Sequence, residues 1–244
     1  MLTGSPRRAG GAQKIPTPSL RRNAGAPMWG EMTADFSFES VIALIQQHSI
    51  DGRAQKTPRV DEKVSAVLAL LAPGENGAEI LLTRRSTKLS NHQGEISFPG
   101  GRVDEGESII EAALRETHEE VGVHSQLVKV HAELSPLSTF VSRSYIVPVV
   151  ATVEEKPDLL INSFEVERAL WVPLAELVRA DTFSWEWWNF DRVEVPDDRP
   201  MFFFHLDDET IWGATARMLH ELLCVIHGVN DWRSAVEPLA AAIV

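Results

Sequence analysis

Hydrophobic residues recur along this 244-residue chain with two different spacings. Apolar residues three and four positions apart predict amphipathic helices over residues 36–47, 107–121 and 211–226. Apolar runs bounded by Gly, Pro and charged residues predict strands over residues 63–71, 78–83, 127–137, 144–153, 169–172 and 201–206, the first two of which are expected to pair as a hairpin. A helical turn is expected to follow Pro173 and end near Ala180, and a last short helix is expected over residues 231–242.

This alternation of strands and helices predicts an α/β fold. A chain of this length with 44% hydrophobic residues can build one large core, so we expect one catalytic domain over residues 31–244, with its core at about 60–227. Residues 1–30 contain four Pro and five Gly without apolar periodicity, which predicts a disordered leader. The polar segment 51–62 is expected to be a linker.

Charge and cysteine content narrow the classes of partner. The net charge is −12, and residues 31–244 carry 18 basic against 35 acidic side chains, which opposes binding to a nucleic-acid polymer. No apolar run approaches the 18 residues that a membrane helix needs. The single Cys224 excludes an internal disulfide and fits a reducing compartment. We therefore expect a cytoplasmic protein, with a mitochondrial location as the alternative if the Arg-rich leader is a transit peptide. A homodimer is expected only from its frequency among soluble enzymes.

The predicted helix over residues 107–121 has one acidic side. Its apolar residues share a stripe that is expected to be buried: Ile110, Leu114, Thr117 and Val121. Its carboxylates lie on the opposite side, next to the small Ala112: Glu116, Glu119 and Glu120. Like charges four residues apart destabilise a helix, and a divalent cation would reverse that interaction. Carboxylates without Cys or paired His suit Mg²⁺ or Mn²⁺, although a solvated acidic face is the alternative interpretation.

Seven residues with fixed spacing resemble the Nudix box, G-x5-E-x7-R-E-U-x-E-E-x-G-U, where U is a bulky apolar residue: Gly101, Glu107, Arg115, Glu116, Glu119, Glu120 and Gly122. Thr117 departs from the commoner apolar residue at its position, but its hydroxyl can bond back to a helix carbonyl. The resemblance implies a Nudix-type α/β/α sandwich with a mixed sheet and metal-dependent hydrolysis of a diphosphate. It also implies that Glu116, Glu119, Glu120 and the Gly101 carbonyl bind Mg²⁺ or Mn²⁺. The resemblance further implies that Arg115 pairs with Glu107, and we expect it to orient the carboxylates.

The segment before the box is similar to the signature L-L-T-x-R-S-x3-R-x3-G-x3-F-P-G-G of the coenzyme A pyrophosphatase branch of this family: residues 81–86, 94 and 98–101. That similarity implies hydrolysis of coenzyme A or an acyl-coenzyme A to 3′,5′-ADP and a 4′-phosphopantetheine derivative. It implies substrate contacts from Arg85, Ser86, Gly94 and Phe98. Arg84 and Arg85 also stand at the end of a predicted strand beside the site and are candidate phosphate contacts, with a surface charge as the alternative for one of them. Ser90 stands where the signature has Arg, and neither Lys88 nor His92 reproduces a bidentate guanidinium.

Several assignments stay open in the sequence. The base that activates water is either Glu120 or Glu165, which lies in a loop before a strand with Glu167 behind it; exposed loop charge is the alternative for both loop residues. The substrate alternatives are NADH, another dinucleotide, ADP-ribose or a nucleoside triphosphate, and a non-catalytic nucleotide sensor is the alternative class. We interpret Trp185, Trp187 and Trp188 as half-buried strand residues. His118, His124 and His131 lack the spacing of a zinc site.

Overall fold

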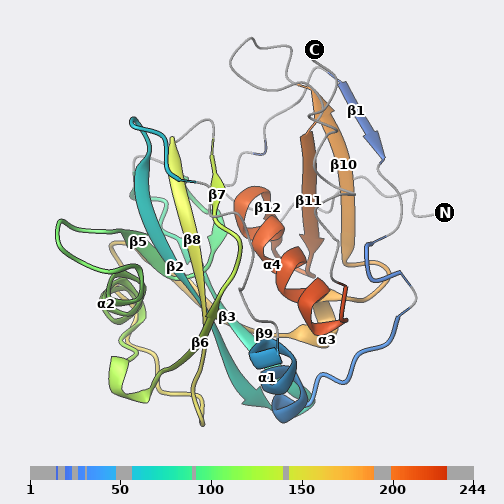
Figure 1. Cartoon of the computed structure of the whole chain (residues 1–244), viewed down its shortest axis with the longest axis horizontal. Helices are drawn as coiled ribbons and strands as arrows, with labels where there is room; N and C mark the ends of the chain where they lie inside the picture. Colours follow the sequence, from blue (N-terminus) through green and yellow to red (C-terminus); the bar gives the residue numbers. More distant parts are fainter. Residues whose placement is uncertain are drawn as a thin grey trace.

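The structure is a computed structural model, and it describes residues 15, 20–23, 27–30, 32–47, 57–89, 92–139, 143–189 and 199–229. In this part of the chain the strands form one eight-stranded and one four-stranded sheet, with helices packed around them (Figure 1). No helix within the described ranges is long and apolar enough to cross a membrane.

The eight-stranded sheet is built around strand β2 (Lys63–Gly74). This strand pairs antiparallel with β3 (Gly77–Arg85), which confirms the predicted hairpin, and parallel with β8 (Ser144–Thr152). The sheet is therefore mixed, as expected. Its other strands are β4 (Ile96–Ser97), β5 (Gly100–Arg102), β6 (Lys129–Glu133), β7 (Leu137–Ser138) and β9 (Val166–Pro173). The main order is β4-β3-β2-β8-β6, with β5 paired to β2, β7 to β8 and β9 to β3.

Both faces of this sheet are covered, which explains the uninterrupted apolar run in β2. Leu68 and Leu70 point to one face and join the core beneath helix α2 (Ile109–Val121). Ala69 and Leu71 point to the other face and join a second core that includes helices α1 (Phe38–Gln47) and α4 (Gly213–Ile226). The α/β architecture with a mixed sheet is thus confirmed.

The second core also contains the aromatic four-stranded sheet. Its strands follow the order β1 (Leu20–Asn23), β10 (Phe183–Asn189), β11 (Arg199–His205) and β12 (Thr210–Trp212). Trp185 stacks on Phe202 with ring centroids 5.6 Å apart and an interplanar angle of 2°. The tryptophans of β10 are therefore buried or half-buried strand residues, as interpreted from the sequence.

The segment expected to be a disordered leader contributes to this core. Residues 20–23 form β1, and Trp29 is buried with its ring 4.9 Å from that of Phe183, which differs from the disorder expected there. Burial of this large aromatic side chain contributes favourable free energy that offsets part of the entropy lost when the residues around it are ordered. Residues 1–14, 16–19 and 24–26, residues 51–56 of the linker and the helix expected at 231–242 lie outside the described residues.

Several predicted boundaries were wrong for local reasons. Helix α2 begins at Ile109, not at residue 107, because Ser108 caps it. Helix α4 begins at Gly213, whose positive φ of 64° separates it from strand β12. The strand expected over 127–137 is divided into a 3-10 turn (Ser125–Leu127), β6 and β7, and a register shift interrupts the pairing of β6 with β8 between Val130 and Ala132. The helical turn expected after Pro173 is present as α3 (Leu174–Leu177), which ends three residues before the predicted end near Ala180.

The buried face of α2 also differs from the predicted stripe. Ile110 is 38% exposed, whereas Ala112 and Ala113 are fully buried. Small side chains at these positions let the helix backbone approach the sheet closely, so Ala112 and Ala113 pack into the core between α2 and the sheet. Thr117 is buried, and its hydroxyl donates to the Ala113 carbonyl at 2.7 Å, as expected from the sequence.

Candidate active site

Both ends of helix α2 are fixed by local hydrogen bonds. At its start, Ser108 Oγ accepts from the Glu111 amide at 3.2 Å, while Glu111 Oε2 accepts from the Ser108 amide at 2.9 Å. This reciprocal pair is a capping box. At its end, Gly122 adopts a left-handed conformation with φ of 76° and donates to the His118 carbonyl at 2.9 Å. The carboxylates between these caps therefore have well-defined positions.

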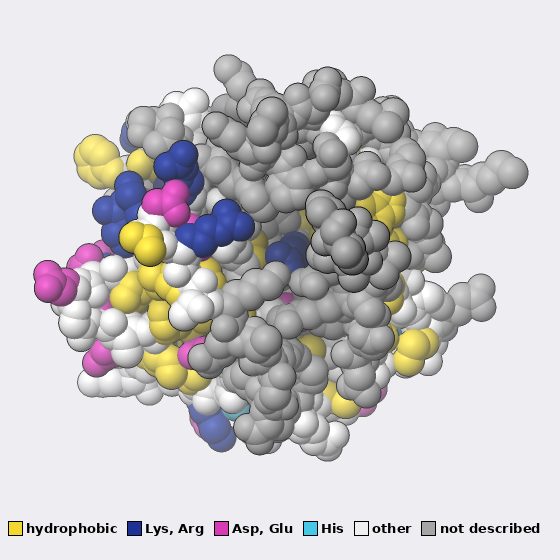
Figure 2. All heavy atoms as spheres, turned by 45° about the horizontal axis from the view of Figure 1, so that its top comes forward, with side chains coloured by type: hydrophobic (Ala, Val, Ile, Leu, Met, Phe, Trp, Pro, Cys, Tyr) yellow, Lys and Arg dark blue, Asp and Glu magenta, His cyan; other side chains and the backbone are white. Residues whose placement is uncertain are grey.

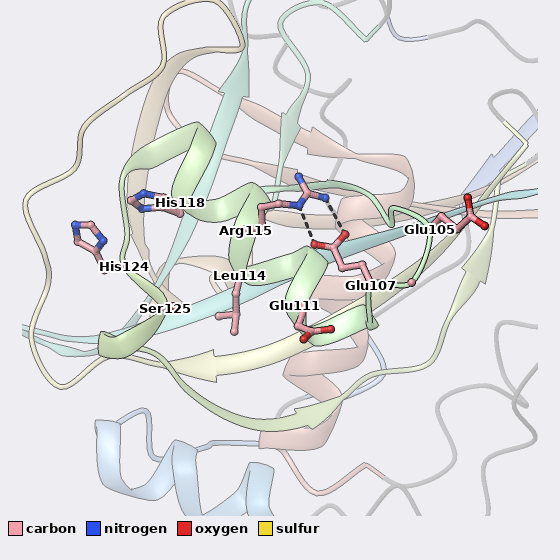
Figure 3. Close-up of a pocket in the computed structure, with 9 residues that line it drawn as sticks. Glu105, Glu107, Glu111, Leu114, Arg115, His118, His124 and Ser125 are labelled. Carbon is pink, nitrogen blue, oxygen red and sulfur yellow. Dashed lines mark hydrogen bonds and ion pairs between the residues drawn. The ribbon is translucent and has the colours of Figure 1, made fainter.

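Arg115 connects α2 to the loop that precedes it. Its Nε and Nη2 atoms donate to the two carboxylate oxygens of Glu107 at 2.8 and 3.0 Å, and Figure 3 shows the two side chains pointing toward each other. These bonds lower the pKa of Glu107 to about 2. Nη2 also donates to the Arg102 carbonyl at 3.0 Å, and Nη1 donates to Glu116 at 3.0 Å and to Glu119 at 3.3 Å. Arg115 thus pairs with Glu107, as the resemblance implied, and its bonds to Glu116 and Glu119 are consistent with the expected orienting role.

Glu116 lies directly against the backbone of β5. A Cβ added to Gly101 would stand 2.3 to 2.5 Å from the carboxylate atoms of Glu116, so only glycine leaves room for this carboxylate. Burial raises the pKa of Glu116 above its ordinary value, opposed by Arg115 and assisted by the charges of Glu119 and Glu165. The carboxylate is therefore held close to backbone and to other negative charges.

Glu120 is the most buried member of this acidic group, with 3% of its surface exposed. One carboxylate oxygen accepts from the Gly100 amide at 3.3 Å, and the other lies 3.9 Å from Nη1 of Arg85. Burial raises the pKa of Glu120 to about 8, although Arg85 and the Gly100 amide lower it, and repulsion from Glu165 and Glu116 adds to the increase. A buried carboxyl group with a strongly raised pKa is typical of functional sites.

Glu165 reaches the same region from the loop before β9. It is half-buried, and its carboxylate accepts from Asn162 Nδ2 at 3.3 Å. Its charge raises the pKa of both Glu116 and Glu120, so the structure brings three of the predicted carboxylates into mutual electrostatic contact. The interpretation of Glu165 as an exposed loop charge is therefore wrong. Glu167 is exposed and points elsewhere, with its carboxylate 3.6 Å from Arg84 Nε.

The two adjacent arginines of β3 lie on opposite faces of the sheet. Arg85 faces Glu120, whereas Arg84 Nη1 donates to Glu209 at 3.1 Å on the side of the four-stranded sheet. Successive side chains of a strand alternate between faces, so only one of the pair can reach the carboxylates. The prediction of a substrate contact from Arg84 is wrong for this arrangement, and Arg85 occupies the arginine position of the R-S pair in the signature.

Three other predicted substrate residues contribute to the surrounding fold. Phe98 is 1% exposed within the second core, so its ring cannot contact a substrate as predicted. Ser86 is buried, and its hydroxyl accepts from the Lys88 amide at 3.2 Å. Gly94 has a positive φ of 69° and donates to the Arg85 carbonyl at 3.1 Å. Ser86 and Gly94 thus shape the loop after β3. Asn162 was missed because an isolated asparagine carries no motif.

The acidic group offers suitable donors for a hard divalent cation. No three His, Cys, Asp or Glu side chains are already gathered around one metal position in the described ranges. Glu119 is half-exposed and bonded to Arg115, so the expected ligand set stays a prediction. Glu116 and Glu120 are nevertheless oxygen donors whose pKa values are raised by burial and by repulsion. A bound cation would offset both effects, and Mg²⁺ and Mn²⁺ prefer such donors.

A separate hollow of about 570 Å³ lies along α2 next to the Glu107–Arg115 pair (Figure 3). His118 and His124 line it with ring centroids 4.6 Å apart. Its lining includes Leu114 but none of the three carboxylates that interact electrostatically, so it is not the candidate catalytic centre.

Comparisons with known proteins show the family to which this chain is similar. The NUDIX domain family matches residues 62–197. Nudix hydrolase 3 of Caenorhabditis elegans is 30% identical over 192 residues, which cover 71% of this chain and 80% of that protein. The uncharacterized Nudix hydrolase NudL of Photorhabdus laumondii is 36% identical over 145 residues, or 59% of this chain and 74% of that protein. Among solved structures, the Nudix hydrolase RenU of M. smegmatis has 25% identity and a TM-score of 0.42, covering 48% of this chain and 73% of that chain.

Proposed function

Because this chain belongs to the Nudix family, we propose that it is a metal-dependent hydrolase that cleaves the diphosphate bond of coenzyme A or an acyl-coenzyme A. The products would be 3′,5′-ADP and a 4′-phosphopantetheine derivative. The observation that carries the hydrolase proposal is the convergence of Glu116, Glu120 and Glu165 beside Gly101, with Arg85 facing them. The signature around Arg85 supports coenzyme A within the wider class of nucleoside diphosphate derivatives.

Hydrolysis of a diphosphate depends mainly on positioning and on neutralising the charge at the transferring phosphorus. In this proposal Glu116, Glu119, Glu120 and the Gly101 carbonyl hold Mg²⁺ or Mn²⁺. The metal, when bound, supplies positive charge at the phosphate oxygens and lowers the pKa of bound water. Arg85 lies next to Glu120 and can donate bidentate hydrogen bonds to a phosphate from the same side.

We assign the base that accepts the proton of the attacking water to Glu165. Glu165 is less buried than Glu120, and the side-chain amide of Asn162 donates to its carboxylate and orients it. Glu120 is the alternative base, and it lies deeper, between the Gly100 amide and Arg85. A general base must lie within reach of water, which favours the half-buried carboxylate.

Mass-spectrometric product analysis tests the proposal. The purified chain is incubated with coenzyme A, an acyl-coenzyme A, NADH, ADP-ribose or dGTP, with Mg²⁺ and separately with EDTA. Formation of 3′,5′-ADP from coenzyme A only with metal is the expected result. Cleavage of a different substrate would support the hydrolase proposal but overturn the coenzyme A assignment. Ser90 would then be the first residue to substitute, because it stands where the signature has Arg. Binding of one of these five compounds without cleavage of any of them would favour the alternative that the chain is a non-catalytic nucleotide sensor.

A further inference from the structure

An exposed aromatic ring stands next to the proposed catalytic base. Phe164 immediately precedes Glu165, and 74% of its surface is exposed. Burial of this side chain against a ligand would therefore contribute favourable free energy to binding. An exposed aromatic ring next to the proposed base is available for stacking against a planar nucleobase. The proposed hydrolysis by the carboxylates does not use this ring.

The turn that carries Phe164 is fixed to the catalytic helix. The backbone N–H of Asn162 donates to the Glu120 carbonyl at 2.9 Å, which attaches the turn to α2. Within the turn, Asn162 Oδ1 accepts from the Phe164 amide at 3.2 Å, and the Asn162 carbonyl accepts from the Glu165 amide at 3.0 Å. The backbone that carries Phe164 is therefore fixed relative to α2 and to Glu165.

A cation lies over the same ring. Lys88 Nζ is 5.4 Å from the centroid of Phe164 and donates to the Ser163 carbonyl at 3.4 Å. No carboxylate of the described residues lies within ion-pair distance of Lys88. Its charge is thus available to an anion, and Lys88 lies in the loop that follows β3, three residues after Arg85. Figure 2 shows that Lys and Arg side chains gather with acidic and hydrophobic ones on part of the face it presents, despite the net charge of −12.

We propose that Phe164 and Lys88 form the subsite for the nucleoside half of the substrate. The planar base stacks on the ring of Phe164, and Lys88 pairs with a phosphate of the same nucleotide. Stacking of a base on an aromatic side chain does not depend on a particular hydrogen-bond pattern, so the subsite selects a nucleotide and not one specific base. This inference rests on the proposed function and adds which half of the diphosphate the protein recognises.

Calorimetric titration of the full chain with ADP and with inorganic pyrophosphate, both in Mg²⁺, tests the subsite. Phe164→Ala should weaken ADP binding by about five-fold or more, as expected for loss of one stacked base, and leave pyrophosphate binding unchanged. Phe164→Trp should retain ADP binding. Leu160→Ala is the matched control, because Leu160 is also 74% exposed but packs over Gly122 at the end of α2. Lys88→Met should weaken ADP binding and reduce its dependence on salt.

The outcomes separate this inference from the proposed function. Equal ADP affinities in Phe164→Ala and Leu160→Ala, or no ADP binding by the unmodified chain, would overturn the subsite even if the chain hydrolyses coenzyme A. Conversely, selective loss of ADP binding in Phe164→Ala would support the subsite even if no substrate is cleaved. Exposed positions tolerate substitution, and thermal unfolding confirms that each variant is folded.

Discussion

At the scale of single residues, two neighbouring glycines meet different kinds of atoms. A Cβ at Gly100 would lie 2.3 Å from the Ala66 carbonyl oxygen, and this residue has a positive φ of 152°. A Cβ at Gly101 would instead meet the carboxylate end of Glu116. A flexible side chain can move away, whereas the backbone of a central strand cannot. Gly100 is therefore required by the fold, and Gly101 by the position of Glu116.

Substitution of each glycine by alanine should separate stability from activity. We expect Gly100→Ala to lose about 1–3 kcal/mol of unfolding free energy, through strain and the backbone clash. Gly101→Ala should unfold near the temperature of the unmodified chain but lose about 10- to 100-fold in hydrolysis, because Glu116 is displaced. Thermal unfolding and initial rates with Mg²⁺ measure both effects. Full activity in Gly101→Ala would show that hydrolysis does not require Glu116 in this position.

At the scale of an element, helix α2 holds a carboxyl group that destabilises the metal-free fold. The pKa of Glu120 is raised to about 8 in the folded chain, while an unfolded glutamate titrates near 4.3. Between these values the folded state binds a proton that the unfolded state has released. The free energy of unfolding attributable to Glu120 therefore decreases as the pH rises from about 4.5 to about 8.

Glu120→Gln should remove this loss of stability. In EDTA the variant should exceed the unmodified chain by a few kcal/mol at pH 8 and by little at pH 4.5, as measured by urea unfolding. Mg²⁺ should narrow the difference at pH 8, because it binds more tightly to the chain that has the Glu120 carboxylate. Glu119→Gln is the control, since that side chain is half-exposed and should change stability little. A gain that is equal at both pH values would contradict the raised pKa.

The elements themselves were predictable where periodicity or spacing is strong. The helix over the box, the β2–β3 hairpin and the strands at 144–153 and 201–206 follow from local patterns, and each exists with shifted ends. The start of α2 could also have been predicted correctly, because Ser108 and Glu111 have the spacing of a capping box. Its buried face was not: hydrophobicity favours Ile110, but close packing against a sheet selects Ala112 and Ala113.

The sequence predicts the carboxylates of the site better than the positions of its arginine and aromatic side chains. The spacing of the box identifies Glu116 and Glu120 whatever their surroundings. Strand alternation shows that Arg84 and Arg85 must diverge, yet the sequence does not indicate which one faces the helix. Phe98 matches the signature, but a motif does not give the direction of a side chain, and this ring is part of the core.

At the scale of the whole molecule, a buried ionic contact joins the two sheets. Glu209, between β11 and β12, is 1% exposed and accepts from Arg84 Nη1 of β3 at 3.1 Å. Arg168 of β9 lies 3.6 Å from the same oxygen. Residues 84 and 209 are 125 positions apart, and no local pattern pairs them. The β-strand that carries Arg85 is thus attached to the aromatic sheet on its other face.

Removing one partner of this contact should cost more than removing both. Arg84→Met leaves the carboxylate of Glu209 buried without its nearest cation, and we expect a loss of about 3 kcal/mol, at the low end for buried pairs because Arg168 remains. Arg84→Met combined with Glu209→Leu should recover most of that loss, since two apolar side chains can pack where the charges were. Urea unfolding of the three proteins measures the difference. Arg168→Met, at a side chain that is 45% exposed, should have a smaller effect. If the double variant is as unstable as Arg84→Met, the cost lies in lost packing and not in an uncompensated charge between the sheets.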